Sequence, residues 1–446
     1  KRGYILKVIA MEEERFDATV DAGLSILSGM IEDAKKAGEK QLSGEDVFRL
    51  YDTFGFPIDL TREIAGEAGL ALDDAKFDEL MKAQKVRARE ARANISGWSN
   101  ATGSLIKGLD KTVFTGYEKL EDEGRVLAIL ADGMNADEIS EGECSVILDR
   151  TPFYGEGGGQ VGDTGTLTVG KTVLNVTDTK KSDGVYIHLC TVADGILKKG
   201  DTVTAAVDAH RRMAIMRNHS ACHLLQSALR RVLGSHVEQA GSYVSDTVCR
   251  FDFTHFNAVT PQELAEVERI VNAKIFEALP VHIKVMPLKE AKELGAMALF
   301  GEKYGDIVRV VDVEGFSTEF CGGTHVSNTA ELGCFKILSE SSVAAGIRRI
   351  EGTTGYGVLR LLDEKSDMLN QTAGALKVSN IHDLPARAAA LTAELRSVQK
   401  ELDDLKQRQT AMKASGLFED AKDVDGIKIF TMYLTGTATD ALRKLC

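Results

Sequence analysis

Two short pairs of residues carry side chains that could bind a metal ion. His219 and His223 stand four residues apart, so on a helix both imidazoles point the same way, roughly 5–6 Å apart at Cβ. Cys321 and His325 are also four apart and enclose two glycines, whose backbone freedom would let both side chains face one point. Three nitrogens and one sulfur suit tetrahedral zinc better than magnesium or calcium, which prefer oxygen. The sequence therefore predicts a zinc site.

The spacing leaves the kind of metal site open. Either pair by itself arises often by chance, but the chain has only nine histidines and three of them lie in these motifs, which favours a true site. Four protein ligands would make a closed, structural site, whereas three ligands and a weak fourth would leave room for water or substrate. If one ligand binds loosely, Cys321 is the one that could give way.

Two further segments could line a site. Gln239 carries an amide that can hold a hydroxyl or carbonyl of a substrate without adding charge, although it could equally be a plain surface or turn residue. The glycine-rich run 154–165 invites comparison with a phosphate-binding loop. It lacks both the Gly-Lys-Ser/Thr ending and a Gly-x-Gly-x-x-Gly pattern followed by a clear helix, so neither nucleotide-binding interpretation holds. We expect a loop on a β domain that packs against substrate or backbone.

The bulk composition is that of a globular protein with several domains. The chain has 446 residues, of which 43% are hydrophobic and 27% are charged. No apolar run approaches the roughly 20 residues that span a bilayer, and no signal-peptide pattern is present. Seven scattered cysteines do not form an evident disulfide framework. We therefore expect a reducing, cytoplasmic location in which cysteine is free to bind metal.

The net charge of −13 argues against a general nucleic-acid binder, which is usually basic. A negative net charge is nevertheless compatible with a protein that binds RNA through local basic patches and is acidic elsewhere. Each candidate patch could equally be a solvated helix face or edge. The candidates are Lys82, Lys85, Arg87, Arg89 and Arg92; Arg211, Arg212 and Arg217; and Arg348 and Arg349.

The first 95 residues predict helices. Apolar residues recur at three- and four-residue spacing over 16–31, which gives a helix one apolar face. Ser43 followed by Asp46 resembles a capping box with Asp in place of Glu, and it predicts a helix start. Glycine and proline break that helix over 55–57, and a long polar helix is expected over about 74–92.

From residue 112 to residue 207, short β-rich runs separated by Gly and Asp predict a small barrel or sandwich. A helix over 208–233 then carries the first histidine pair, and strands and helices alternate to about residue 362, as in an α+β domain. From Leu384 to Leu405 apolar residues are spaced four then three, a heptad seam that predicts a coiled-coil or helical-hairpin arm. The run 426–434 is expected to be the first strand of another domain.

The predicted fold class is multidomain α+β, in four parts. These are a helical part over 1–95, a β-barrel-like subdomain over 96–207, an α+β domain with the zinc site over 208–362, and a helical linker with the start of a further domain over 363–446. The first residue is Lys rather than Met, and we expect both ends to be cuts through a longer protein.

Taken together, these motifs resemble the alanyl-tRNA synthetase family. The two metal-binding pairs are similar to those of its editing domain, which free-standing editing deacylases share. Further matches are the glycine-rich loop 157–163 and the runs 250–253 and 346–351. The run Leu50–Thr61 resembles the tRNA-recognition region of the full synthetase, which free-standing editors lack. The heptad arm resembles the linker to the C-terminal domain of the family.

The resemblance implies a hydrolase that removes wrongly attached serine or glycine from tRNA(Ala). A small amino-acid pocket cannot strongly reject such near relatives of alanine, so a second, hydrolytic site is needed. By resemblance, the four residues of the two pairs bind Zn²⁺, and Gln239 lines the editing pocket and reads the serine hydroxyl. Asp52 corresponds to an aspartate that reads the acceptor-stem wobble pair. Arg348 and Arg349 are predicted to contact tRNA.

The implied chemistry is ester hydrolysis, in which water attacks the aminoacyl carbonyl on the terminal ribose of the tRNA. Zinc could polarise that carbonyl, activate the water or orient the ester, and the sequence does not choose among these. Cys321 is a candidate catalytic residue as well as a ligand. Thr324 could position the water or the ribose, or only cap a turn. No ATP site is visible, and we expect the adenylate-forming motifs, and hence ATP, only in the full-length enzyme.

Three other interpretations stay open at this point. A free-standing deacylase is disfavoured by the 50–61 match and by the heptad arm. A non-catalytic tRNA-binding module would use zinc only to stabilise its fold. A zinc peptidase would need the glutamate of His-Glu-x-x-His as its general base, and Ser220 occupies that position. The oligomeric state is open too, because the heptad arm could pair with a second chain.

Overall fold

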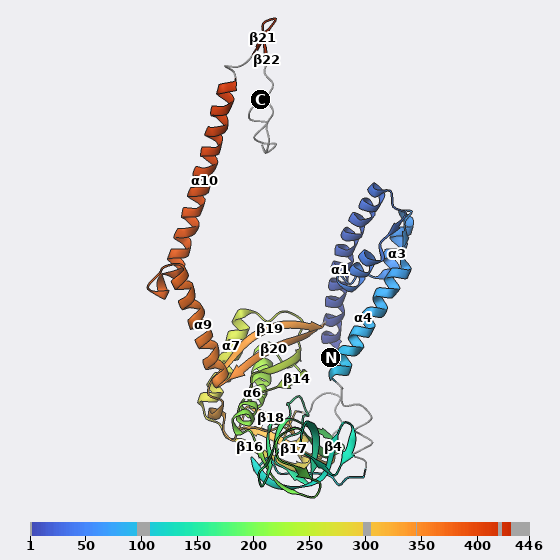
Figure 1. Ribbon diagram of the computed structural model, residues 1–446, viewed down its shortest axis with the longest axis vertical. Helices are drawn as coiled ribbons and strands as arrows, with labels where there is room; N and C mark the ends of the chain where they lie inside the picture. Colours follow the sequence, from blue (N-terminus) through green and yellow to red (C-terminus); the bar gives the residue numbers. More distant parts are fainter. Residues whose placement is uncertain (1, 96–107, 298–304, 345, 418–421, 430–446) are drawn as a thin grey trace. The chain divides into compact units, whose positions relative to one another are not determined.

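The computed structural model describes residues 2–95, 108–297, 305–344, 346–417 and 422–429 (Figure 1). The chain falls into two compact units, Lys1–Val358 and Leu359–Cys446. The first unit contains helices, a β-barrel and an α+β part, so the predicted multidomain α+β class is confirmed. Within the described residues no helix combines the length and the apolar character needed to cross a membrane. The four-part division stays a prediction.

The helical part follows the sequence prediction closely. The hydroxyl of Ser43 caps α2 by accepting a hydrogen bond of 3.1 Å from the backbone N–H of Asp46. The predicted break falls at Gly55, where a φ of 71° needs glycine. The apolar face of α1 is fully buried at Leu27, whereas Phe16 is 55% exposed. The elements are α1 (Arg2–Ala37), β1 (Gln41–Leu42), α2 (Gly44–Asp52), α3 (Ile58–Glu67), β2 (Ala71–Leu72) and α4 (Asp74–Ile95).

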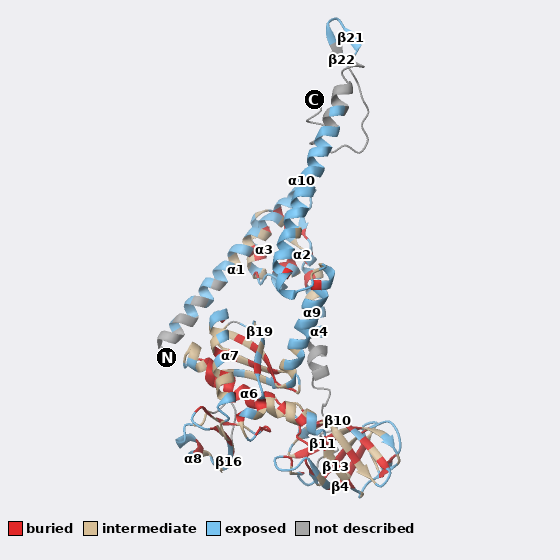
Figure 2. Cartoon of the chain, turned by 90° about the vertical axis from the view of Figure 1, so that its left-hand side faces the viewer, coloured by how far each residue is buried: buried red, intermediate tan, exposed pale blue. Residues whose placement is uncertain are grey.

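Six strands close into a barrel, one of the two forms that the sequence predicts. Their order is β13-β9-β10-β11-β7-β4, and β13 also pairs with β4. Alternate residues contribute to the core, in which Ile129, Val146, Leu167 and Leu174 are fully buried. Figure 2 shows buried segments in the barrel strands. The elements are β3 (Val113–Phe114), β4 (Glu121–Ala131), β5 (Met134–Ala136), β6 (Glu138–Ile139), β7 (Glu143–Leu148), β8 (Arg150–Thr151), β9 (Gly165–Val169), β10 (Thr172–Ser182), β11 (Val185–Asp194), β12 (Leu197–Lys198) and β13 (Thr202–Val207).

The α+β part builds its core from two helices and a four-stranded antiparallel sheet. Asp208 caps α6 by accepting a hydrogen bond of 3.0 Å from the Arg211 backbone N–H. Helices α6 and α7 pack against each other and against the sheet β14-β15-β20-β19. A second sheet, β16-β17-β18, ends directly before Cys321. The elements are α6 (Ala209–Leu233), β14 (Gln239–Val244), β15 (Cys249–Thr254), α7 (Pro261–Phe276), β16 (Val281–Pro287), α8 (Leu288–Glu293), β17 (Ile307–Val313), β18 (Ser317–Phe320), β19 (Phe335–Ala344) and β20 (Ile347–Thr354).

The second unit consists mainly of helix. The heptad seam forms one continuous helix, on which Leu395, Leu402 and Leu405 are exposed, so the coiled coil stays a prediction. A short hairpin pairs β21 with β22, and only β22 falls within the predicted final strand, of which residues 430–434 lie outside the described residues. The elements are α9 (Tyr356–Ala375), which begins in the first unit, α10 (Leu384–Leu417), β21 (Lys422–Val424) and β22 (Ile427–Ile429).

A buried ion pair attaches the barrel to α6. Arg212 and Asp163 are 2% and 1% exposed, and the Arg212 Nε donates to both carboxylate oxygens at 2.9 and 3.0 Å. The Nη atoms of Arg212 also donate to the carbonyls of Gly116 and Pro152, each at 2.8 Å. The interpretation of Arg212 as part of a basic surface patch is therefore wrong. Its guanidinium is buried and binds Asp163, which fixes the position of the glycine-rich run.

The barrel also buries a neutral histidine, which gives the fold a predictable pH dependence. His188 donates from Nδ1 to the Val146 carbonyl at 2.9 Å, and its Nε2 accepts from the Thr151 hydroxyl at 2.7 Å. Burial lowers the pKa of His188 to about 4, although the Val146 carbonyl opposes this. Since the unfolded chain takes up this proton near pH 6.5, stability is complete above that pH and is lost as the pH falls toward 4.

We expect His188→Gln to flatten the pH dependence of stability between pH 6.5 and 4, a window in which His188 alone accounts for about 3 kcal/mol. Urea denaturation at a series of pH values would measure this slope. His282→Gln, at an exposed position, is the matched control and should keep the wild-type slope. An unchanged slope in His188→Gln would contradict the assignment.

Candidate metal centre

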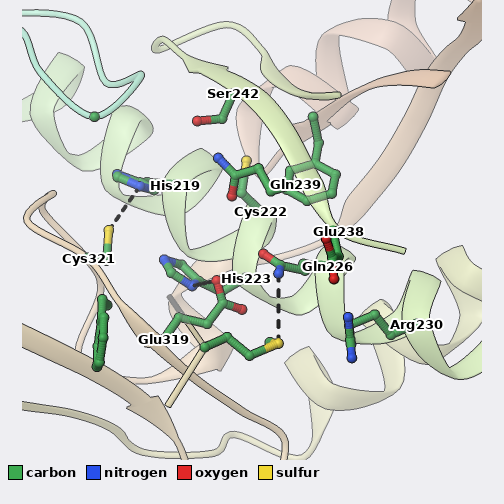
Figure 3. A pocket seen from close by; sticks show the side chains of 14 residues that line it. His219, Cys222, His223, Gln226, Arg230, Glu238, Gln239, Ser242, Glu319 and Cys321 are labelled. Atoms are coloured by element: carbon green, nitrogen blue, oxygen red, sulfur yellow. Dashed lines mark hydrogen bonds and ion pairs between the residues drawn. The ribbon is translucent and has the colours of Figure 1, made fainter. Parts of the chain in front are cut away.

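The four predicted ligands converge on one point. Their donor atoms all lie within 4.8 Å of one another, and the Cys321 Sγ lies 3.4 Å from the His219 Nε2 and 3.2 Å from the His325 Nε2. A nitrogen and a sulfur bound to one tetrahedral zinc are about 3.5 Å apart, given bonds of about 2.0 and 2.3 Å. Three imidazoles and a thiol at these separations could hold a metal ion and are compatible with zinc. Figure 3 shows His219, His223 and Cys321 around this point.

Local geometry explains how two distant segments meet. One turn of α6 separates His219 from His223, and their ring centroids lie 5.7 Å apart. The loop after β18 then approaches α6 so closely that a Cβ on Gly323 would lie 2.0 Å from the His219 Cε1. Neither Gly322 nor Gly323 has a positive φ. Gly323 is required by this close approach, because its missing side chain makes room for the histidine.

Two of the three histidines are oriented through neutral partners at Nδ1. The His219 Nδ1 lies 2.8 Å from the Gln160 Oε1, and the His325 Nδ1 lies 3.1 Å from the Ser220 Oγ. Since each Nδ1 is engaged, each Nε2 is left to face the centre, which is how proteins fix the tautomer and angle of a metal-binding imidazole. Ser220 thus supports a ligand from the position where a zinc peptidase would carry its glutamate.

His223 is oriented by a carboxylate. Its Nδ1 lies 2.8 Å from the Glu319 Oε2, and both side chains are buried. Burial lowers the pKa of His223, but Glu319 and Cys321 together outweigh this effect and raise it to about 10. A carboxylate behind a ligating imidazole raises the basicity of that ligand, so Glu319 favours binding of a cation at the centre.

The thiol of Cys321 is disposed to ionise. Burial raises its pKa, but the adjacent imidazoles of His219 and His325 more than offset this, so that the pKa lies well below the ordinary value. Burial and His219 also lower the pKa of His325 to about 3, which keeps that ring neutral. A thiolate and a neutral imidazole are the forms that bind metal.

A hollow of about 280 Å³ opens beside the ligands and brings Gln239 to them. In Figure 3 the Gln239 amide reaches from β14 toward the centre, with Ser242 on the same strand. Thr324 does not line this hollow: its hydroxyl accepts a hydrogen bond of 2.9 Å from the Gln160 amide, and its side chain is buried. The structure therefore groups Gln239 with the ligands and places Thr324 behind them.

The three residues predicted to bind tRNA lie in other places. Asp52 ends α2, is exposed, and accepts a hydrogen bond from the Gln84 amide. Arg349 on β20 pairs with Asp252 on the neighbouring strand β15 at 2.7 Å. Arg348 is buried against Glu340 on β19.

The sequence interpretation missed the residues that hold the ligands. Gln160 stood in a glycine-rich run that offered no histidine-like spacing, and only its contact with α6 shows its role. Glu319 lies two residues before Cys321 on β18. Cys321 follows directly after the end of the strand, so the i, i+2 spacing that places residues on one face of a strand was only a weak signal that a carboxylate accompanies the thiol.

Comparison with known proteins agrees with this geometry. Residues 1–211 match the class II (A) tRNA synthetases, and residues 308–351 match the second additional domain of threonyl and alanyl tRNA synthetases. The alanine–tRNA ligase of Bacillus subtilis (strain 168) is 45% identical over 447 residues, and that of Acetivibrio thermocellus is 46% identical over 443. This chain belongs to the alanyl-tRNA synthetase family. These alignments cover 100% and 98% of the chain, which spans about half of each ligase, 51% and 50%.

Within this alanyl-tRNA synthetase chain, the match to the second additional domain contains Glu319, Cys321 and His325. The first histidine pair lies outside both matched segments and is joined to them only by the fold. Only some of the residues of the centre therefore lie within a matched domain.

If Gln160 orients His219, its loss should weaken metal binding without unfolding the chain. We expect Gln160→Ala to lower zinc affinity by about 10–100-fold, the range typical of partners that orient a ligand. Competition with a chromophoric chelator would measure the affinity, and circular dichroism would check the fold. Gln262→Ala, at an exposed position on α7, should bind zinc like wild type. If Gln160→Ala and Gln262→Ala bind zinc with equal affinity, Gln160 does not support metal binding.

Proposed function

We propose that this chain hydrolyses the ester that joins serine or glycine to tRNA(Ala), as the editing part of an alanine–tRNA ligase. The observation that carries the proposal is the position of the His₃Cys cluster at the wall of a hollow that also holds Gln239. A structural zinc site would be closed by its four ligands, whereas here His219, His223 and Cys321 line a hollow large enough for a small substrate.

The lining of the hollow suits a small amino acid with a polar side chain. Gln239 offers a donor and an acceptor to a serine hydroxyl. Glu238 and Glu319 place negative charge where the amino group of an aminoacyl ester, a cation, has to lie. Gln226 is buried and adds a second neutral amide. These features favour a seryl or glycyl ester.

The residues of the chain would take different roles in hydrolysis of the ester. Gln160, Ser220 and Glu319 hold the three imidazoles in place, and Gln239 fixes the amino-acid moiety so that its carbonyl meets a water molecule. The water oxygen bonds to the carbonyl carbon, the carbon–oxygen bond to the ribose breaks, and the ribose oxygen leaves as a hydroxyl after taking the proton that the water gives up. Bound Zn²⁺ would supply Lewis-acid stabilisation of the developing oxyanion. Cys321, partly exposed toward the hollow, is the ligand nearest to this chemistry.

The proposal includes contacts beyond the hollow. Asp52 would read the acceptor stem, and the side chain of Arg349, 27% exposed, together with Arg348 would contact the tRNA. The exposed heptad seam of α10 would pair with a second copy of the chain. A protein that acts on tRNA and keeps its described cysteines as free thiols belongs in the cytoplasm.

The first test is the release of amino acid from mischarged tRNA. We expect the chain to free serine from Ser-tRNA(Ala) while sparing Ala-tRNA(Ala), and Cys321→Ala to lower the rate by more than about 100-fold, beyond the effect of residues that only orient a ligand. Timed release of labelled amino acid would measure both. Cys334→Ala, at an exposed cysteine, should keep the wild-type rate.

A metal-stripped sample separates catalysis from stabilisation. If chelation abolishes serine release while circular dichroism stays unchanged and added zinc restores the rate, the metal serves the reaction. If chelation unfolds the chain and no preparation releases serine although tRNA binds, the chain is a zinc-stabilised binding module and the hydrolase proposal fails.

Gln239 gives the proposal a specificity test. Removal of its amide should lower hydrolysis of the seryl ester by about 10-fold, because a buried hydroxyl would lose its partner. The glycyl ester has no such hydroxyl and should be affected much less. The ratio of kcat/KM for Ser-tRNA(Ala) to that for Gly-tRNA(Ala) in Gln239→Ala measures this. An equal loss on both esters would mean that Gln239 does not read the side chain.

A further inference from the structure

Two cysteines of the barrel face each other across neighbouring strands. Cys144 on β7 and Cys190 on β11 are direct partners in the antiparallel register. Residues that oppose each other in this way have Cα atoms about 4.5–5.5 Å apart, which lies within the span of about 4.4–6.8 Å that a disulfide bridges. A hydrogen bond also joins the two thiols. The two sulfurs can therefore bond to each other by rotation of their side chains, without a change of strand register.

A small molecule can reach this pair from one side. Both cysteines line a hollow of about 480 Å³ on the barrel, although Cys144 is only 7% exposed and Cys190 only 2%. The hollow is also lined by the carboxylates of Asp132 and Glu143, and no cation is among its described lining residues. This lining disfavours an anionic oxidant such as glutathione disulfide and leaves a small neutral one, hydrogen peroxide, as the reagent that fits.

The two thiols differ in how readily they ionise. The hydrogen bond from Cys190 lowers the pKa of the Cys144 thiol, although burial opposes this effect. The same hydrogen bond and burial raise the pKa of Cys190 well above its ordinary value, and the Cys190 thiol also donates to the His188 carbonyl at 3.4 Å. Since the thiolate is the attacking form of cysteine, Cys144 is suited to react first and Cys190 to react second.

The remaining described cysteines are arranged differently. Cys222 and Cys249 are hydrogen-bonded as well, but one lies on α6 and the other on β15, so no strand register aligns them. Cys321 belongs to the candidate metal centre. Cys334 is exposed and directly precedes β19. Among the described residues, only the barrel pair consists of two cysteines in direct register across a sheet.

We propose that Cys144 and Cys190 form a dithiol that hydrogen peroxide closes reversibly to a disulfide inside the barrel. This site is separate from the metal centre, since none of the four candidate ligands is among the described residues that line the hollow. It goes beyond the proposed editing function and does not depend on it. The free thiols of the structure are the reduced form.

The reaction takes place in two steps. The Cys144 thiolate attacks one oxygen of the peroxide, the oxygen–oxygen bond breaks, and hydroxide leaves, so that Cys144 becomes a sulfenic acid. The Cys190 sulfur then bonds to the Cys144 sulfur and displaces hydroxide, which takes up the Cys190 proton and leaves as water. In sum, two thiols lose two electrons and two protons, and one peroxide becomes two water molecules.

The disulfide would join β7 to β11 and enclose the chain between residues 144 and 190. A link of this kind restricts the unfolded chain more than the folded one. The oxidised barrel should therefore unfold at a higher urea concentration than the reduced barrel, which makes the pair a device that stabilises the barrel when peroxide is present.

The test maps the cysteines of the zinc-loaded chain after treatment with hydrogen peroxide. Trypsin separates the pair, because Cys144 lies in peptide 126–150 and Cys190 in peptide 182–198, and neither peptide contains another cysteine. We expect mass spectrometry of a non-reduced digest to find these two peptides linked in most molecules and separated again by dithiothreitol. If the peptides stay unlinked in the folded chain, or link only in concentrated urea, the proposal is overturned.

Single variants test the order of the two steps. In Cys190→Ala the sulfenic acid of Cys144 has no second thiol, so dimedone should label Cys144, and without dimedone Cys144 should proceed to the sulfinic acid. In Cys144→Ala, Cys190 should stay a thiol. Cys334→Ala should give the same linked peptides as wild type. Equal labelling of the remaining cysteine in both barrel variants would contradict the assignment of Cys144 as the attacking thiol.

Urea denaturation gives a readout that a chance modification would not move. Peroxide should raise the urea midpoint of wild type and of Cys334→Ala, and dithiothreitol should reverse the rise. Neither barrel variant should show a rise, and circular dichroism would check that both are folded before treatment. If the midpoint of wild type is unchanged although the peptides are linked, the disulfide forms but does not stabilise the barrel, and that part of the proposal fails.

Discussion

Three imidazoles and a thiol can bind one ion only if every ring turns an unprotonated nitrogen toward the same point. Contacts between several segments of the first unit hold the rings in that orientation. A buried imidazole nitrogen without a partner costs about 1–3 kcal/mol, so each ring needs a group behind it. Gln160 and Ser220 form hydrogen bonds with His219 and His325, and Glu319 lies at ion-pair distance from His223. These three partners come from a barrel loop, from α6 itself and from β18, so the centre exists only where these three segments meet.

A buried ion pair between Arg212 and Asp163 holds the barrel against α6. Asp163 and Gln160 lie three residues apart in one glycine-rich run, and Arg212 binds Asp163 from α6. Burial of an ion pair is costly unless its remaining hydrogen-bonding groups are satisfied, and here two backbone carbonyls take up the other Arg212 N–H groups. The result is a fixed position for Gln160, which then reaches His219. The chain is acidic overall, and yet it buries the cationic side chain of Arg212.

The candidate metal centre lies between two hollows that share Cys321 and differ in the residues that line them. Carboxylates and neutral amides surround the first hollow, which holds Gln239, and cations and aromatic rings, among them Arg309 and Tyr117, surround the second. Because Cys321 belongs to both, the bond to be hydrolysed would lie where the chemistry of the lining changes. The glycine-rich run of the barrel lies beside both hollows.

The sequence by itself determined the features that depend on local spacing. It predicted the helix that carries the first histidine pair, the break at Gly55, the strand-rich segment and the four residues of the cluster that could hold a metal ion, because periodicity and residue type are local properties. It could not decide between barrel and sandwich, since closure depends on the pairing of β13 with β4 across the whole segment. Nor could it reveal Gln160, whose role requires docking of the barrel on α6. Arg212 had the pattern of a surface cation and became a buried one because Asp163 lies opposite it. These residues act through contacts between segments far apart in the chain, and only the tertiary structure brings such segments together.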